Sequence, residues 1–130
     1  MSDDGQALVE FALVLPVILV LAVAIVQLAE LGVARLALEH AAAEGARTGA
    51  LTNDDELIRD SVAAAVAPLD PDEVAVEIAP SGRQDPRNAD PRGSLLYVRL
   101  RYALPVPLGF AGLPRFVVHG TAARRVEWTP

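Results

Sequence analysis

Residues 11–29 read FALVLPVILVLAVAIVQLA, and this apolar stretch decides how the rest of the chain is interpreted. Its only polar residue is Gln27. As a helix it would be roughly 28 Å long at ~1.5 Å per residue, close to the ~30 Å hydrocarbon core of a bilayer. The rest of a 130-residue chain is too small to enclose such a helix as a soluble core. The stretch therefore predicts one transmembrane helix, with a kink at Pro16, whose ring removes a helical hydrogen bond.

The helical pattern continues beyond this stretch to about Thr48, and Gly49 is the expected end of the helix. Opposite charges lie three or four residues apart, which suits pairing along a helix surface. These pairs are Arg35 with Glu39 and Glu44 with Arg47. An apolar stripe consists of Leu31, Ala34, Leu38, Ala41 and Ala42. The stripe can be a docking face for the chain's own C-terminal part or a seam against neighbouring subunits, since small residues permit close helix approach in both cases.

The C-terminal part reads as a short helix followed by three strands. Asn53 can cap a helix that ends near Ala67, before Pro68. Apolar and polar residues then alternate with the period of a half-buried strand. The alternating segments are 73–79, 95–103 and 115–127. The expected fold class is α+β, with a long N-terminal helix of the pilin kind, a short second helix and a small antiparallel three-stranded sheet backed by that second helix.

Two loops join the expected strands. Residues 80–93 are rich in Pro, Gly, Asp and Arg, so an exposed loop that does not pack is expected. Residues 104–114 form an apolar Pro/Gly loop, which would cover an edge of the sheet or contact a partner. Near the C-terminus, Arg124 and Arg125 are expected on the wet face of the last strand, and Trp128 at the small core or on a partner surface.

Composition excludes several classes of function. A net charge of −6 argues against nucleic-acid binding, which requires a basic face. Without cysteine the chain has neither disulfides nor thiolate zinc sites. The two histidines, His40 and His119, are far apart, and nothing supplies a nucleophile beside a base. We therefore expect no enzyme, no metal, no cofactor and no small-molecule substrate.

A carboxylate stands directly before the apolar stretch, in the segment Gly5-Gln6-Ala7-Leu8-Val9-Glu10. An ionised Glu isolated in lipid would cost several kcal/mol, so Glu10 needs an explanation. It can lie at the level of the lipid headgroups, near the positive end of the helix dipole. Alternatively, if the chain is cut after Gly5, Glu10 becomes its fifth residue and can neutralise the freed N-terminal amine of an adjacent subunit.

The stretch from Gly5 to Pro16, GQALVEFALVLP, resembles the TadE-like and TadG-like family, the pseudopilins or minor pilins of the tight adherence (Flp) pilus system. The Leu15-Pro16 pair and the run Ala41 to Arg47 fit the same pattern. The resemblance implies a minor pilin or pseudopilin that takes part in pilus assembly. It also implies cleavage between Gly5 and Gln6 by a prepilin peptidase, with Glu10 as the recognition and assembly residue and Phe11 as its hydrophobic neighbour.

With this resemblance, the chain divides into a leader (1–5), a transmembrane and extended helix (6–50) and a small extracytoplasmic α+β domain (51–130). The implied partners are the membrane, the peptidase and other pilin or pseudopilin subunits that contact the N-terminal helix. The implied location is the bacterial cytoplasmic membrane, crossed once with the C-terminal domain outside, and by extension an extracellular pilus. The leader is acidic, so this orientation comes from the resemblance and not from the charges that flank the helix.

A rival interpretation is a membrane-anchored extracytoplasmic binding module, either uncleaved or cut by an ordinary signal peptidase. Ala22-Val23-Ala24 resembles the small-residue site that such a peptidase uses. Against this interpretation, the segment before the apolar stretch has no positive charge, and the apolar pattern continues past Ala24.

Overall fold

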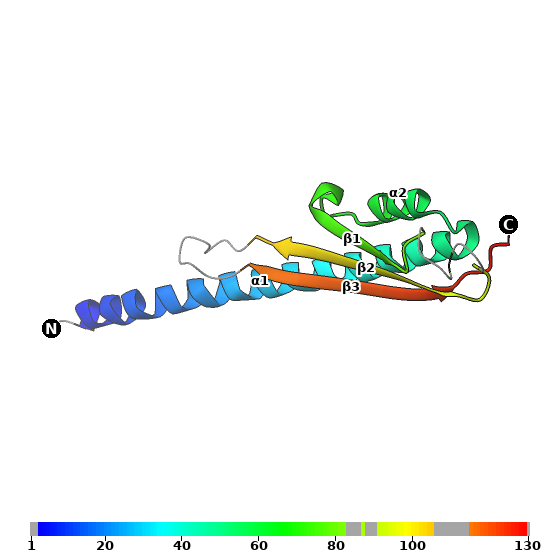
Figure 1. Cartoon of the computed structure of the whole chain (residues 1–130). Coiled ribbons are helices and arrows are strands. Elements are labelled where there is room, and N and C mark those ends of the chain that lie inside the picture. The colour runs from blue at the N-terminus through cyan, green and yellow to red at the C-terminus, as the bar shows by residue number, and fades with distance from the viewer. Residues whose placement is uncertain (1–2, 83–86, 88–90, 106–114, 130) are drawn as a thin grey trace. The chain divides into compact units, whose positions relative to one another are not determined.

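The structure, a computed structural model, describes residues 3–82, 87, 91–105 and 115–129. Its elements are helices α1 (Asp3–Thr52) and α2 (Asp55–Ala65), the 3₁₀ turn η1 (Pro71–Glu73), and strands β1 (Val74–Ala79), β2 (Leu95–Leu104) and β3 (Phe116–Arg125) (Figure 1). The chain forms two compact units, Met1–Gly32 and Val33–Pro130. The α+β class with one long helix, one short helix and three strands is confirmed.

The end of α1 differs from the prediction. Gly49 does not end the helix, because α1 continues to Thr52 and Gly49 is buried against Leu96 and Ile58. The helix ends at Asn53, which has a positive φ of 52° and donates its backbone N–H to the carbonyl of Gly49 at 2.9 Å. Asparagine adopts this left-handed conformation more easily than most residues. Asn53 is therefore the terminator of α1 and not the cap of α2.

Asp54 caps α2 instead. Its backbone is extended, and its carboxylate accepts hydrogen bonds from the N–H groups of Glu56 at 2.8 Å and Leu57 at 3.3 Å. A short side chain with an acceptor oxygen is what the unpaired N–H groups of a first helical turn require. The helix ends at Ala65, two residues before the expected position, and buries Ile58 and Val62.

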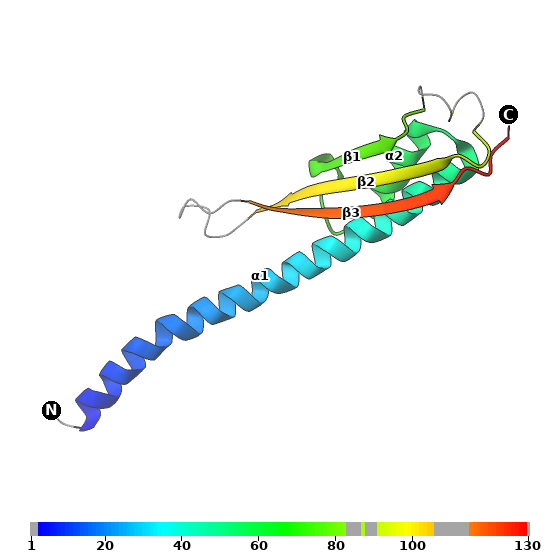
Figure 2. The same cartoon turned by 60° about the horizontal axis from the view of Figure 1, so that its bottom comes forward.

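The sheet is antiparallel, as predicted, and the structure gives its strand order as β1-β2-β3 (Figure 2). Its alternation is clearest in β2, where one face is buried; the buried residues are Leu96, Val98, Leu100, Tyr102 and Leu104. Val74 and Ile78 of β1, and Val118 and Gly120 of β3, lie on the same face. The opposite face is open to solvent or partially exposed along all three strands.

The second part of α1 and all of α2 pack on the buried face of the sheet. A stripe of small residues on α1 makes this possible. Its buried members are Ala34, Ala37, Leu38, Ala41, Ala42, Gly45, Ala46, Gly49 and Ala50. Four of the five residues in the predicted stripe are buried: Ala34, Leu38, Ala41 and Ala42. The stripe is thus a docking face for the chain's own sheet, and the compact C-terminal unit includes this part of α1.

Strand β3 approaches α1 most closely at Gly120. A Cβ atom built there would lie 2.5 Å from the backbone carbon of Leu38 and 2.6 Å from its carbonyl oxygen. A side chain of any size would therefore push the strand away from the helix. Beyond β3, the backbone N–H groups of Glu127 and Trp128 both donate to the carbonyl of Ala50, at 2.8 and 3.1 Å. These bonds satisfy a carbonyl in the last turn of α1, which lacks a helical partner.

The loop after β1 does not match its predicted character. Arg87 is fully buried and forms an ion pair with Asp55 at the start of α2. Asp55 also accepts the N–H of Gly82 at 2.9 Å, and Asn53 donates to the carbonyl of Arg87 at 3.3 Å. Part of this loop is therefore packed, because a buried guanidinium requires a charged partner. Residues 83–86, 88–90 and 106–114 lie outside the described residues, so the prediction for residues 104–114 stays a prediction.

Candidate functional site: the N-terminal anchor helix

The residues predicted to carry function lie in the first turns of α1. Gly5, Gln6, Glu10 and Phe11 are all helical, and the last three are exposed. Gln6 and Glu10 lie one turn apart on the same side of the helix, and the amide nitrogen of Gln6 is 3.4 Å from a carboxylate oxygen of Glu10. The structure therefore brings the residue after the predicted cleavage bond next to the predicted assembly residue.

The Gly5–Gln6 bond lies within the first turns of α1. The N–H groups of a first turn have no intrahelical acceptor, so this part of a helix opens at low cost. Glycine lowers helix stability there further. The residues on both sides of the predicted cleavage bond are nevertheless helical in the structure.

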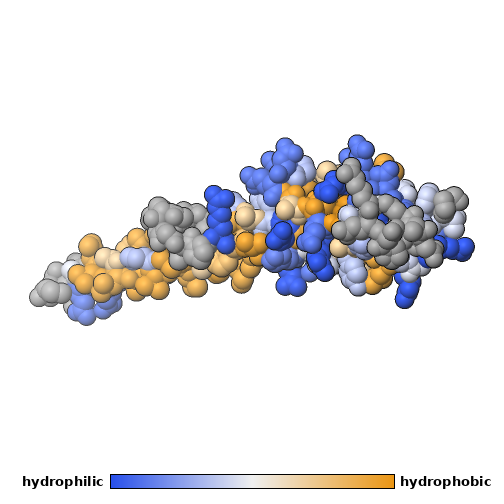
Figure 3. Space-filling model, in the orientation of Figure 1, coloured by the Kyte–Doolittle hydropathy of each residue, from blue (hydrophilic) through white to orange (hydrophobic). Residues whose placement is uncertain are grey.

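Past Glu10, exposed apolar side chains follow one another along α1, and Figure 3 shows one face of this surface. From Leu8 to Leu28 the large hydrophobic residues are 40–71% exposed. Among the described residues, one helix is long and apolar enough to cross a membrane, with a mean hydropathy of 2.9 in its most apolar window and none of that window buried. Pro16 lies inside this helix, which continues on both sides of it. Such a surface requires lipid or other apolar helices around it.

Gln27, the single polar residue of the apolar stretch, has a partner that the sequence analysis did not identify. Its side-chain amide donates to the carboxylate of Glu30 at 2.8 Å. The spacing of three residues was the signal that could have revealed this contact. The hydrogen bond lowers the cost of placing an amide near the end of a membrane-spanning segment.

The other polar candidates do not form a second site. His40 on α1 and His119 on β3 are exposed. Among the residues that the structure describes, no group of three or more His, Cys, Asp and Glu side chains could hold a metal ion. Arg35 and Glu39 form the predicted helical ion pair at 3.0 Å, on an exposed surface where such pairs add little stability.

Comparison with known proteins agrees with the resemblance of the N-terminal segment. Residues 5–47 match the family model described as TadE-like protein. The matched segment contains Gly5, Glu10 and the whole apolar stretch, so the predicted resemblance is confirmed there. The match covers the N-terminal third of the chain, and the C-terminal part lies outside it. No curated protein and no solved structure matches the chain.

Proposed function

We propose that this TadE-like chain is a minor pilin or pseudopilin that takes part in assembly of a tight adherence pilus. In this proposal the apolar part of α1 crosses the bacterial cytoplasmic membrane once, and the unit Val33–Pro130 folds outside the cytoplasm. A prepilin peptidase removes residues 1–5, and the exposed helix then associates with helices of other pilin or pseudopilin subunits. The chain acts through assembly and not through catalysis.

One observation supports this proposal above the others: an apolar helix exposed on every side begins directly after a carboxylate. The exposed apolar surface from Leu8 to Leu28 favours association with lipid before assembly and with apolar helices of other subunits after it. Glu10 at the start of that surface favours a partner of opposite charge, because an unpaired carboxylate is costly in an apolar bundle. Cleavage before Gln6 would create an amine on the first residue, one helical turn from the carboxylate of its own chain.

The cleavage site is tested by sequencing the N-terminus of the protein extracted from membranes of cells that express the peptidase. The expected start is Gln6. Glu10→Ala should reduce the processed fraction or the amount of assembled protein. Glu30→Ala is the matched control, because it removes a carboxylate from the same helix at the opposite end of the apolar stretch.

Two results would contradict the proposal. An intact Met1 in the presence of the peptidase, or a start after Ala24, would favour the membrane-anchored binding module. Equal processing and equal assembly of the Glu10→Ala and Glu30→Ala variants would show that Glu10 has no special role. Fractionation of sheared pili from membranes then tells whether the processed chain enters the filament or stays in the membrane.

A further inference from the structure

The open face of the sheet carries an excess of positive charge. We call it the basic sheet face and define it by Arg99, Arg101, His119 and Arg125, which lie exposed on β2 and β3. In the described part of the chain, Glu77 is the only acidic residue on this face, and it lies 3.6 Å from Arg99. Arg99 also lies over the ring of Tyr97, 5.8 Å from its centroid, and is about half exposed. The face is thus basic in a chain whose net charge is −6.

The arrangement of charges is not that of an ordinary solvated sheet face. Arg101 lies between Ala75 on β1 and His119 on β3, so neither cross-strand neighbour is acidic. Arg99 and Arg101 are two residues apart on one strand, which places them on the same face at roughly 7 Å. Glu77 compensates the charge of Arg99, whereas no acidic residue lies in register with Arg101. A partner with negative charge would compensate Arg101.

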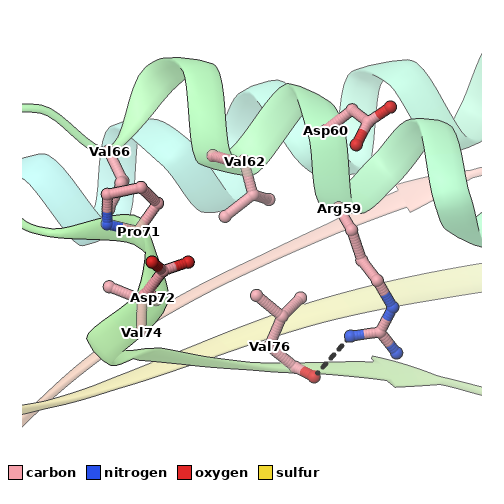
Figure 4. Close-up of a pocket in the computed structure, with 9 residues that line it drawn as sticks. Arg59, Asp60, Val62, Val66, Pro71, Asp72, Val74 and Val76 are labelled. Carbon is pink, nitrogen blue, oxygen red and sulfur yellow. Dashed lines mark hydrogen bonds between the residues drawn. The ribbon is translucent and has the colours of Figure 1, made fainter.

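The same chain has a matching acidic surface on the other side of the sheet. Residues 54–73 contain seven carboxylates and one arginine. We call the exposed part of this segment the acidic helix side; its members are Asp54, Glu56, Asp60, Asp70, Asp72 and Glu73. Because α2 buries Ile58 and Val62 toward the sheet, Glu56 and Asp60 point away from it. The arginine, Arg59, donates to the backbone carbonyl of Val76 at 3.2 Å and thus lies over the edge of β1 (Figure 4).

A pocket of about 300 Å³ opens within the acidic helix side, between α2 and β1 (Figure 4). Its apolar wall contains Val62, Val66, Val74 and Val76, and three charged residues, Arg59, Asp60 and Asp72, also line it. The positive charge of Arg59 already lines this pocket, so a second arginine is better paired by the exposed carboxylates at its rim, such as Asp60.

We propose that the basic sheet face of one copy docks on the acidic helix side of a second copy, with Arg101 directed at the carboxylate of Asp60. The two surfaces lie on opposite sides of one unit, so the contact is head-to-tail and repeats from copy to copy. Exposed charge pairs of this kind each contribute little, because water and salt screen them. The contact is therefore weak between free molecules and becomes significant when the anchor concentrates the copies in one membrane. The inference rests on the proposed function as an anchored assembly protein.

Cross-linking between copies tests this contact, and the chain has no native cysteine to interfere. One copy carries Thr121→Cys beside Arg99 on the open face, and a differently tagged copy carries Ala64→Cys on the exposed side of α2. Both full-length chains are co-expressed in membranes and treated with a short bismaleimide. We expect efficient cross-linking between the Thr121→Cys copy and the Ala64→Cys copy, and little between two copies that both carry Thr121→Cys.

Charge exchange makes the test specific. Arg101→Glu in the Thr121→Cys copy, or Asp60→Arg in the Ala64→Cys copy, should each lower the cross-linked fraction by more than about tenfold, because like charges then face each other. Combining the two changed copies should restore the cross-link, since the signs are again opposite. Arg124→Glu is the matched control: it makes the same change on β3, in register with Leu96 on the other face, and should have no effect.

Each outcome has a distinct meaning. Cross-linking that survives both single changes, or fails to return in the combined pair, overturns the proposal. Efficient cross-linking between two Thr121→Cys copies indicates a face-to-face dimer and also overturns it. Binding to phosphatidylglycerol vesicles that depends on Arg101 but not on Asp60 assigns the face to a membrane surface instead. A Leu19→Cys pair in the anchor reports helix association separately: if it cross-links while the domain pair does not, the proposed function stands and this inference fails.

Discussion

Replacing Gly120 by alanine should force β3 away from α1 and destabilise the unit Val33–Pro130. The added Cβ would lie 2.5 Å from the backbone carbon of Leu38 and 2.7 Å from its Cβ. These are backbone and near-backbone atoms, which cannot rotate away like the end of a long side chain. Relief therefore requires a shift of the strand by several tenths of an ångström, which loosens the stripe of small residues beneath the sheet.

Two opposing effects set the change that Gly120→Ala causes in the free energy of unfolding. Overpacking of this kind costs about 1–3 kcal/mol. Removing a glycine from the middle of a strand returns roughly 0.5–1 kcal/mol, because the unfolded chain loses freedom. Together these ranges give a net loss of roughly 0–2.5 kcal/mol in the free energy of unfolding. At the middle value of about 1 kcal/mol, the Tm falls by about 4–8 °C for a unit of roughly 100 residues.

The single tryptophan, Trp128, makes this measurable in the full-length chain, because it follows the segment that pairs with Ala50. Its fluorescence during thermal unfolding in detergent reports on the C-terminal unit and not on the anchor. Gly32→Ala is the control: a Cβ there meets no atom within 4 Å, and no loss of stability is expected. If Gly120→Ala unfolds at the same temperature as the wild type or higher, β3 does not approach α1 in the way described.

Three further predictions concern the C-terminal unit. Asp55→Asn should lower the free energy of unfolding by about 3 kcal/mol, because it leaves the buried guanidinium of Arg87 without its charged partner. Urea titration measures this loss, and a loss below about 1 kcal/mol would contradict the pairing. Asp54→Ala should cost about 1 kcal/mol in the same titration through loss of the helix cap, whereas Asp54→Asn keeps a capping oxygen and should cost much less. Burial, and secondly the charge of Glu73, raise the pKa of Tyr102 above 10.0, so the folded state holds the phenol proton more tightly than the unfolded state. The free energy of unfolding should therefore fall as the pH rises above about 10. In Tyr102→Phe, this fall at alkaline pH should be smaller in a curve of stability against pH.

The candidate site was largely predictable because its signals are local. Glu10 beside an apolar stretch is visible in consecutive residues, and its contact with Gln6 follows from helical spacing. The second candidate, the basic sheet face, was only partly visible. Alternation placed Arg99 and Arg101 on one side of a strand, but their excess of charge depends on which strand lies beside them. Only the register with Ala75 and His119 shows that Arg101 has no acidic cross-strand neighbour.

The limits of prediction are clear at the junction of the two helices. Asn53 and Asp54 both have side chains that can cap a helix, so composition could not separate their roles. The structure separates them through backbone conformation: Asn53 has a positive φ and ends α1, and Asp54 is extended and begins α2. In the same way, Arg87 lies in a polar loop, and its burial depends on Asp55, a residue 32 positions away.

By itself, the sequence determined the long apolar helix, the order of helices and strands, and the faces of the strands that are buried. These properties depend on composition and on periods of two or 3.6 residues, which survive in any arrangement of the elements. Only the tertiary structure decided that the alanine stripe of α1 packs against its own sheet, that Gly120 must lack a side chain, and that opposite charges collect on opposite sides of one unit. Those features arise from contacts between residues far apart in the chain, and such contacts leave no local pattern.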